Sequence, residues 1–427
     1  MNKNRFPSLF QTGPQKIFFF FLLMQCQGLG WAQTPQMSEN NSCLLCHADM
    51  QEDMKGSIHA QQGIFCNRCH GGDPAQPTKE LAKAPGTGYI GSPNKQQIAE
   101  MCGTCHANVE VMNFYGIRTD QLAQYKTSMH GKKLFEGDTN VAVCSDCHGE
   151  HDILPVGDPG SSVYPLNIPK TCNRCHGNEK LMSQYKLPAD IFKTYQHSVH
   201  GKALLEEKDL SAASCISCHG YHGAVPPGAR DVGTTCGKCH MNEKKYFLES
   251  VHAGISAQGK FSECISCHGN HGVQPASKAL YDQACVRCHS ADTPEAKRGG
   301  EIHQMLDEAE EKLRSATILV KQASIEGFFV EPEMAALEAA KTNVIAMAPL
   351  QHTLLPERIS ELHKKVVSAA ADIARSIHQK QQFLRWRKLS LIPMWVFIAM
   401  MISTLWIKYR QLHSRSREKQ DEKKKRS

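Results

Sequence analysis

Apolar side chains in the C-terminal third of the chain recur every three or four residues, which is the period of a helix with one buried face. In one stretch these positions are Ile302, Leu306, Ala309, Leu313, Ala316 and Val320. In another they are Ile359, Leu362, Val366, Ala370, Ile373 and Ile377. Prolines tolerated in a first helical turn mark helix starts at Glu331-Pro332 and Pro356. The pattern predicts an antiparallel helical hairpin or small bundle over 301–388, serving as a stalk.

Two uncharged apolar runs lie near the ends of the chain, and their lengths predict different fates. Residues 389–407 form a run of 19, which is long enough for a transmembrane helix. Residues 408–427 carry nine Lys or Arg against three Asp or Glu, and such a flank stays on the cytoplasmic side. The shorter run Ile17–Met24 follows basic residues, so we expect residues 1–32 to be a cleaved signal peptide. The sequence predicts a single-pass protein of the inner membrane, with the bulk of the chain in the periplasm.

Residues 33–300 have a different pattern, in which pairs of cysteines are followed at once by histidine. The motif Cys-x-x-Cys-His occurs nine times, with the pairs Cys43 and Cys46, Cys66 and Cys69, Cys102 and Cys105, Cys144 and Cys147, Cys172 and Cys175, Cys215 and Cys218, Cys236 and Cys239, Cys264 and Cys267, and Cys285 and Cys288. This motif is the attachment signal for c-type haem, in which both thiols bond to the porphyrin and the imidazole binds the iron. The proximal iron ligands are then His47, His70, His106, His148, His176, His219, His240, His268 and His289. The sequence therefore predicts nine covalently bound c-type haems.

Other uses of paired cysteines fit this sequence poorly. Zinc ribbons also contain CxxC pairs, but they do not require a histidine directly after every second cysteine. A thioredoxin-like redox motif needs a βαβ context, which is absent here. Of the 19 cysteines, 18 lie in the nine motifs, and Cys26 lies in the predicted signal peptide. We therefore expect no disulfide.

A repeat of two motifs organises the cysteine-rich region. Each full unit reads Ser-x-His, then a gap, then CxxCHGxH, then a second CxxCH, and the three full units begin at Ser128, Ser198 and Ser250. A degenerate unit begins at Ser57 and has Gly71-Gly72-Asp73 where the others have Gly-x-His. Residues 33–300 therefore consist of one extra motif followed by four two-haem units.

Composition limits what the cysteine-rich region can build. Stretches rich in Pro and Gly, such as 71–93 and 155–169, cannot be long helices. Aromatic residues make up only 7% of the chain, so the porphyrins must supply most of the buried apolar surface there. We expect a mostly α and loop fold with little sheet, in which haem binding is coupled to folding.

The second axial position of each iron decides between a carrier and a catalyst, because an iron with two protein ligands is closed to substrates. Histidines at repeated positions are the main candidates: His59, His130, His200 and His252 in Ser-x-His, and His151, His222 and His271 in Gly-x-His. His303 is a further candidate, with a helix-surface histidine as the alternative. His197 fits a ligand and a surface residue equally well, and Met101, Met112 or Met129 could substitute at one iron. We expect His352, His363, His378 and His413 to be exposed helix or tail residues.

The paired CxxCH motifs with their CHGxH and Ser-x-His elements resemble multihaem cytochromes of the c3/c7 type, over roughly residues 43–303. The resemblance implies low-potential electron carriers of anaerobic respiration whose irons have two histidine ligands. The helical stalk and C-terminal anchor resemble membrane-bound versions that work beside quinone-linked membrane subunits. The chain departs from the small members of the group in its larger number of motifs.

Three functions are compatible with these features. The first is an electron conduit between a quinone-linked membrane partner, such as a b-type cytochrome, and periplasmic or outer-membrane acceptors, without substrate chemistry of its own. The second is a reductase of the nitrite, hydroxylamine or tetrathionate kind, with one open haem iron. The third is a polymerising cytochrome wire, which the membrane anchor disfavours. The net charge of +7 comes from the signal peptide and the tail, so we do not expect nucleic-acid binding.

Overall fold

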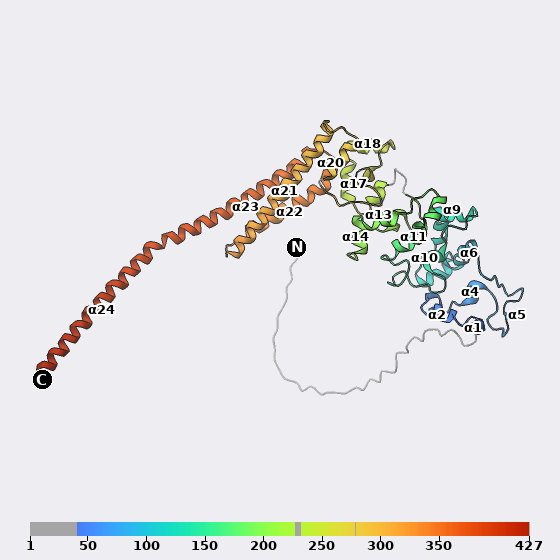
Figure 1. Cartoon of the computed structure of the whole chain (residues 1–427), viewed down its shortest axis with the longest axis horizontal. Coiled ribbons are helices and arrows are strands. Elements are labelled where there is room, and N and C mark those ends of the chain that lie inside the picture. The colour runs from blue at the N-terminus through green and yellow to red at the C-terminus, as the bar shows by residue number, and fades with distance from the viewer. Residues whose placement is uncertain (1–40, 227–231, 278, 427) are drawn as a thin grey trace, which may run out of the picture. The chain divides into compact units, whose positions relative to one another are not determined.

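The computed structural model describes residues 41–226, 232–277 and 279–426, so the predicted signal peptide, residues 1–32, lies outside the described residues. The chain divides into two compact units, one of residues 1–94 with 148–155 and the other of residues 95–147 with 156–427. The fold is 66% helical, and the described ranges contain no strand (Figure 1). The predicted fold class, mostly helix and loop with little sheet, is confirmed.

Short helices carry the cysteine motifs. The first unit contains α1 Cys43–Cys46, α2 Met50–Met54, α3 Ile58–Gln61, α4 Cys66–His70 and α5 Lys79–Ala82. The second unit begins with α6 Lys95–His106, α7 Val109–Met112, η1 Asn113–Tyr115, α8 Gln121–Thr127, α9 Met129–Phe135 and α10 Cys144–His148, whose last residue belongs to the first unit. It continues with α11 Ile168–His176, α12 Glu179–Gln184, α13 Ile191–Gln196, α14 Val199–Leu205, α15 Cys215–His219, α16 Val232–Cys236, α17 Met241–Phe247, α18 Val251–Ala257, α19 Glu263–His268, α20 Ala279–Ala284 and η2 Cys285–Arg287.

The serine of each Ser-x-His element is the N-cap of the short helix that carries the histidine. The Ser128 hydroxyl accepts a hydrogen bond from the Gly131 amide at 2.9 Å, and the Ser198 hydroxyl accepts one from Gly201 at 3.0 Å. A Cβ added to Gly201 would lie 2.0 Å from the Tyr195 carbonyl oxygen, so this helix packs against α13 without room for a side chain. The capped, closely packed helix therefore fixes the direction of the histidine between the serine and the glycine.

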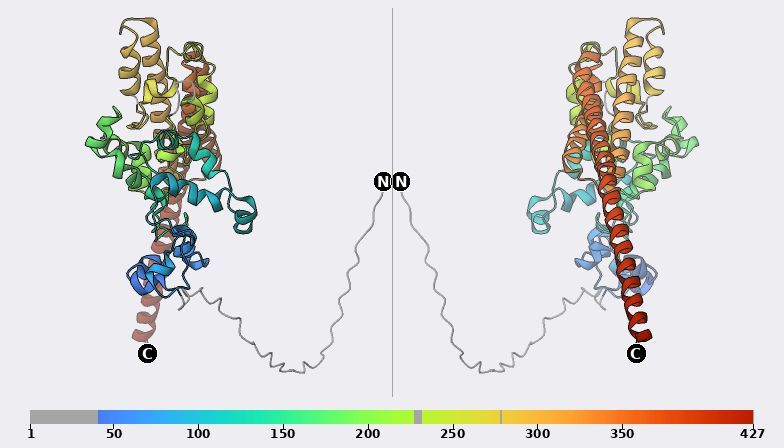
Figure 2. Two further views of the ribbon diagram at one scale, coloured as in Figure 1. Left: turned by 90° about the vertical axis from the view of Figure 1, so that its right-hand side faces the viewer. Right: turned by 90° about the vertical axis from the view of Figure 1, so that its left-hand side faces the viewer.

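Three long helices pack side by side after the last motif (Figure 1; Figure 2). They are α21 Pro294–Ile325, α22 Glu331–Leu350 and α23 Pro356–Ser390, with the short helix η3 Gln351–Thr353 between the last two. α22 and α23 begin at the predicted residues. The apolar stripes predicted from the sequence form the bundle core: Ile302, Ala309, Ile359 and Val366 are buried together, and so are Ala316, Val320, Ile373 and Ile377.

The two ends of this bundle have different neighbours. At the end where α23 begins, Arg358 pairs with Glu249 at 2.8 Å, and Tyr281 hydrogen-bonds with Gln351, so the last two-motif unit packs there. At the other end, Lys380 donates a hydrogen bond to the carbonyl of Phe329 at 2.7 Å in the α21–α22 connection. Since α23 has 35 residues, about 50 Å of helix separates the two-motif unit from the start of the apolar span.

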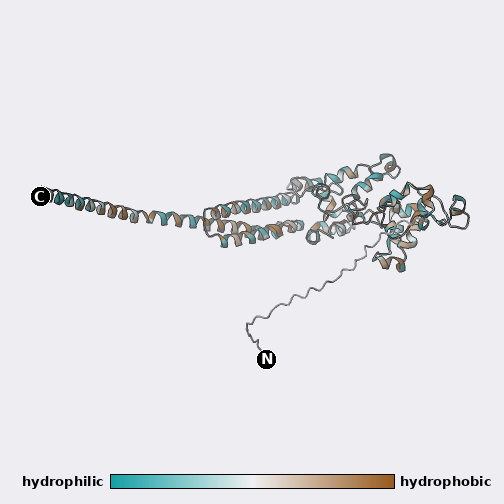
Figure 3. Ribbon diagram, turned by 90° about the horizontal axis from the view of Figure 1, so that it is seen from below, coloured by the Kyte–Doolittle hydropathy of each residue, from teal (hydrophilic) through white to brown (hydrophobic). Residues whose placement is uncertain are grey.

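The C-terminal helix α24, Ile392–Arg426, follows α23 after a break at Leu391 and extends beyond the bundle (Figure 3). Its first half is apolar and its second half is charged, as the colours of Figure 3 show. The helical stretch Pro356–Glu422 is long and apolar enough to cross a membrane, and its most apolar window is not buried against the described chain. This is consistent with the predicted single-pass anchor at 389–407.

Candidate haem-binding sites

The two cysteines of a motif lie on or beside one short helical turn, and the histidine ends that turn. In α4, α15 and α19 the histidine is the last helical residue, and the next residue is a glycine with positive φ: Gly71 (68°), Gly220 (82°) and Gly269 (76°). Residues with a Cβ avoid this conformation, so the glycine stops the helix directly after the ligand. The spacing of the motif thus places two thiols and one imidazole on one compact element.

Six motif histidines lie opposite a second histidine at nearly constant separation. The ring centroids are 6.1 Å apart in His70–His151, His130–His176 and His252–His289, 6.2 Å apart in His200–His240 and His268–His352, and 5.9 Å apart in His219–His271. The angles between the ring planes, in contrast, range from 16° to 53°. A separation that is constant while the angle varies indicates two rings held on a common axis.

This separation is the one that a shared metal ion requires. Two imidazoles bound to opposite sides of one first-row metal ion, each at about 2.0 Å, have ring centroids roughly 6 Å apart. Among the described residues, no group of three or more His, Cys, Asp or Glu side chains could hold a metal ion by itself. A porphyrin supplies the four equatorial nitrogens that such a two-histidine site lacks. The residues therefore fit covalently bound haem and do not fit a structural zinc ion.

The pairs follow a rule of the repeat. A Ser-x-His histidine faces the second motif of its own unit, as in His130–His176, His200–His240 and His252–His289. A Gly-x-His histidine faces the first motif of the preceding unit, as in His70–His151 and His219–His271. Neighbouring repeats therefore complete each other's sites.

Backbone hydrogen bonds fix the same register between repeats. The amide after a Ser-x-His serine donates to the carbonyl two residues beyond the Gly-x-His histidine of the next repeat. The bonds are Ile58 to Ile153 at 2.8 Å, Met129 to Ala224 at 3.1 Å and Val199 to Val273 at 2.9 Å. Each Gly-x-His loop is thus held against the preceding repeat by the backbone as well as by its histidine.

Five of the paired histidines have a lowered pKa, which favours the neutral form that a metal ligand requires. Burial, followed by the charge of the facing imidazole, lowers the pKa of His130, His200, His252, His268 and His271. His70 illustrates a second feature of metal-bound histidine, because its Nδ1 lies 2.8 Å from the Gly91 carbonyl oxygen. A hydrogen bond there leaves Nε2 free to bind the iron.

In the second compact unit of the fold, residues 95–147 and 156–427, sulfur atoms of successive motifs lie side by side. The first cysteine of a unit's second motif hydrogen-bonds with the first cysteine of the next unit: Cys102 with Cys144, Cys172 with Cys215, and Cys236 with Cys264. The middle bond raises the pKa of Cys172 and lowers the pKa of Cys215. Thiols bonded to haem no longer titrate, so these contacts matter for the proximity that they reveal.

Within a repeat, the neighbours are the second cysteine of the first motif and the first cysteine of the second motif. Burial and then the charge of Cys172 raise the pKa of Cys147 to about 11. Burial and the facing thiol likewise raise the pKa of Cys218, beside Cys236, and of Cys267, beside Cys285. The seven motifs from Cys102 to Cys285 thus form an unbroken series in chain order. In the first compact unit of the fold, Cys43 and Cys66 are neighbours as well.

Three predicted ligands do not face a second histidine within the described residues. His303 has its Nε2 3.1 Å from Asp307 and its Nδ1 4.0 Å from Asp282, and its ring stacks on Tyr281. His197 is an exposed C-cap of α13, and among the described residues no histidine ring faces it. The motif histidine His47 is exposed too, and within the described ranges no second imidazole lies against it. The predicted roles of these residues remain predictions.

Four further predicted ligands are His59, His106, His148 and His222. His59 is on α3, His106 ends α6 and His148 ends α10. Burial lowers the pKa of His106 and of His222, which keeps both imidazoles neutral. Their roles as ligands stay predictions.

His352 is the residue that the sequence interpretation missed. We expected it to be exposed, but it is half-buried in η3 and faces His268. Neither a Ser-x-His nor a Gly-x-His element marks it in the sequence. His363 is also not exposed, because its Nε2 lies 3.1 Å from Glu308 inside the bundle.

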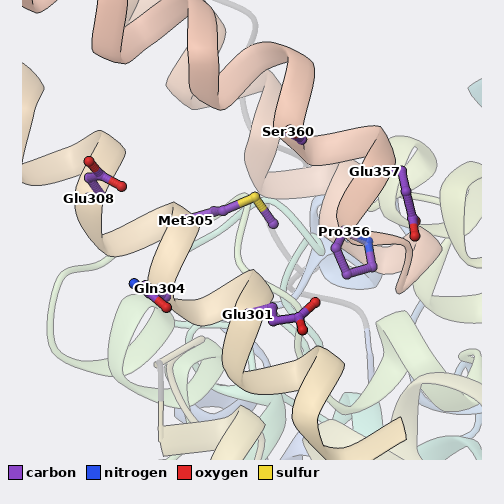
Figure 4. Close-up of a pocket in the computed structure, with 7 residues that line it drawn as sticks. All are labelled: Glu301, Gln304, Met305, Glu308, Pro356, Glu357 and Ser360. Atoms are coloured by element: carbon purple, nitrogen blue, oxygen red, sulfur yellow. The ribbon is translucent and has the colours of Figure 1, made fainter. Parts of the chain in front are cut away.

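The bundle also has a cleft of about 430 Å³ between α21 and the start of α23 (Figure 4). It is lined by Glu301, Gln304, Met305, Glu308, Pro356, Glu357 and Ser360. No motif residue lines it, so it is separate from the haem sites.

Comparisons with known families agree with the haem chemistry. The sequence model of the cytochrome c3 family matches residues 58–177, and that of cytochrome c554 and c-prime matches residues 26–71 and 235–313. A comparison with curated proteins and one with solved structures give no match. The CxxCH motifs, the facing imidazoles and the two family matches together identify the chain as a multihaem c-type cytochrome.

Proposed function

We propose that this cytochrome is a nonahaem electron conduit, anchored in the inner membrane with its haem region in the periplasm. The observation that carries the proposal is the unbroken chain order of the motifs from Cys102 to Cys285, in which a cysteine of each motif lies near a cysteine of the next. A catalyst needs one special site, whereas a conduit needs a series of similar neighbouring sites. The seven neighbouring motifs from Cys102 to Cys285 therefore support a conduit.

The protein's side chains close the irons and set their spacing. Haem bound at these motifs supplies one-electron centres whose potential is lowered by two histidine ligands. His130, His200, His252, His151 and His271 each occupy the position opposite a motif histidine, and this leaves no room for a substrate. We propose that His59 and His222 are distal ligands as well, and the motif histidine His106 lies near enough to His222 to lower its pKa. We therefore assign no bond-making chemistry to these sites.

The membrane anchor defines the kind of electron donor that this conduit needs. The apolar span 389–407 contains no histidine, so it cannot bind a b-type haem of its own. We propose that a separate quinone-linked membrane subunit supplies the electrons and that periplasmic or outer-membrane redox proteins accept them, as in anaerobic respiration. Because about 50 Å of α23 lies between the span and the last two-motif unit, a donor to that unit must itself project from the bilayer along the stalk.

One observation favours a second function, in which the haem at Cys43 has an open iron and reduces a small molecule. His47 is exposed and has no facing imidazole within the described ranges, in contrast to six other motif histidines. A nitrite, hydroxylamine or tetrathionate reductase would use such a position. The conduit remains the better-supported function because it accounts for the whole series of motifs.

Spectroscopy of the full-length protein in mild detergent separates the two functions. The conduit predicts low-spin ferric signals from the motifs whose histidine faces a second histidine, and no oxidation of the reduced protein by nitrite, hydroxylamine or tetrathionate. A high-spin signal together with carbon monoxide binding and rapid oxidation by one of these compounds would favour the reductase. A high-spin signal that is lost in a Cys43→Ala/Cys46→Ala variant would place the open iron at the first motif.

A further inference from the structure

The first motif of the last two-motif unit has no following repeat to supply a second histidine. In two of the preceding repeats, the first motif faces a Gly-x-His histidine from the following unit, as His70 faces His151 and His219 faces His271. The unit that begins at Ser250 is followed by the helical bundle and not by another repeat. Its first motif, Cys264–His268, therefore needs a ligand of another origin.

The bundle places a histidine at the required position. The rings of His268 and His352 have centroids 6.2 Å apart with 28° between their planes. These values lie within the ranges of the five pairs built from repeat histidines, whose separations run from 5.9 to 6.2 Å and whose angles run from 16° to 53°. His352 thus has the same relation to its motif histidine as the Gly-x-His residues have to theirs.

The surroundings of His352 hold its ring in the form suited to a metal. Its Nδ1 lies 3.0 Å from the Pro349 carbonyl oxygen, so a hydrogen bond at Nδ1 leaves the Nε2 lone pair free, as in His70. The next residue, Thr353, is fully buried, and its hydroxyl donates to the Leu350 carbonyl at 2.9 Å. The neighbour on the other side, Gln351, hydrogen-bonds with Tyr281 of the last two-motif unit. Hydrogen bonds therefore hold the residues on both sides of His352 in place.

We propose that His352 is the distal ligand of the haem at Cys264, Cys267 and His268, so that the α22–α23 connection of the stalk completes the haem array. The inference rests on the proposed function, because it requires haem at this motif. The bundle then serves as the terminal cap of the repeats, which in other repeat proteins closes the last interface. Since η3 leads directly into α23, one iron–imidazole bond ties the haem region to the helix that enters the membrane.

Paired variants of the full-length, haem-loaded protein test this assignment. His352→Ala is expected to convert one iron from low spin to high spin in the electron paramagnetic resonance spectrum, with the number of haems unchanged. His363→Ala is the matched control, because His363 lies in the same bundle and its Nε2 is 3.1 Å from Glu308 instead of facing a motif histidine. We expect its spectrum to match that of the unchanged protein.

A third variant gives a result that a purely structural role would not produce. His352→Met keeps an iron-binding group at the position, so one centre should stay low spin while its reduction potential rises, since methionine ligation raises the potential. An unaltered spectrum of His352→Ala, or a high-spin signal in His363→Ala alone, would overturn the assignment. If His200→Ala still produces a high-spin iron in that case, the conduit proposal stands without the stalk ligand.

Discussion

Replacing His200 with alanine should turn one low-spin iron of the full-length protein into a high-spin iron, which carbon monoxide can then bind in the reduced state. The reason is the position of the His200 ring, whose centroid is 6.2 Å from that of the motif histidine His240. Removing one axial imidazole opens that iron and leaves the thioether bonds at Cys236 and Cys239 intact. The measurement is electron paramagnetic resonance of the oxidised protein, quantified per chain.

The control lies three residues earlier in the same repeat. His197 is exposed and faces no histidine within the described residues, so the spectrum of His197→Ala should match that of the unchanged protein. Added imidazole should restore the low-spin signal of His200→Ala by filling the vacant axial position. A high-spin iron in His197→Ala and none in His200→Ala would make His197 the ligand in place of His200 and contradict the pairing of His200 with His240.

Removing the middle haem should divide the conduit into two parts. The Cys172→Ala/Cys175→Ala variant loses the fifth motif, which lies near Cys147 of the fourth and beside Cys215 of the sixth. Four motifs precede it and four follow it in the sequence. After full reduction, oxidation by an acceptor that reaches one end only should separate into a fast and a slow phase in stopped-flow absorbance.

Loss of a terminal motif provides the comparison. Cys285→Ala/Cys288→Ala also removes one haem, but that motif is the last of the series and lies near the eighth through Cys267. Its oxidation should remain a single phase with eight haems. Two phases in both variants, or one phase in both, would contradict a series in chain order, because the position of the missing haem would then have no effect.

The sequence predicted the local elements well because each depends on a few neighbouring residues. The helix starts at Glu331 and Pro356 follow from proline's fixed φ and its missing amide, and the buried faces of the bundle follow from their helical period. The repeated Ser-x-His element also has a local cause, since the serine hydroxyls of Ser128 and Ser198 cap the helices that carry the histidines.

The pairing of histidines could not be predicted from the sequence, because it depends on how repeats pack. His151 faces His70, which is 81 positions earlier, while His130 faces His176 in its own repeat. No periodic pattern distinguishes these partners. His352 was missed for the same reason: it follows a helix of the stalk, and only the packing of η3 against the last two-motif unit brings it to His268.

Weighing the intact mature protein tests the central claim most directly. If all nine CxxCH motifs carry haem, seven of them in a continuous series from Cys102 to Cys285, the mass must exceed that of the polypeptide by nine haem groups, with no zinc. Peptide mapping should find a haem on each cysteine pair from Cys43 to Cys288. A mass with fewer haems, with a motif between Cys102 and Cys285 left as free thiols, would break the series and contradict the account.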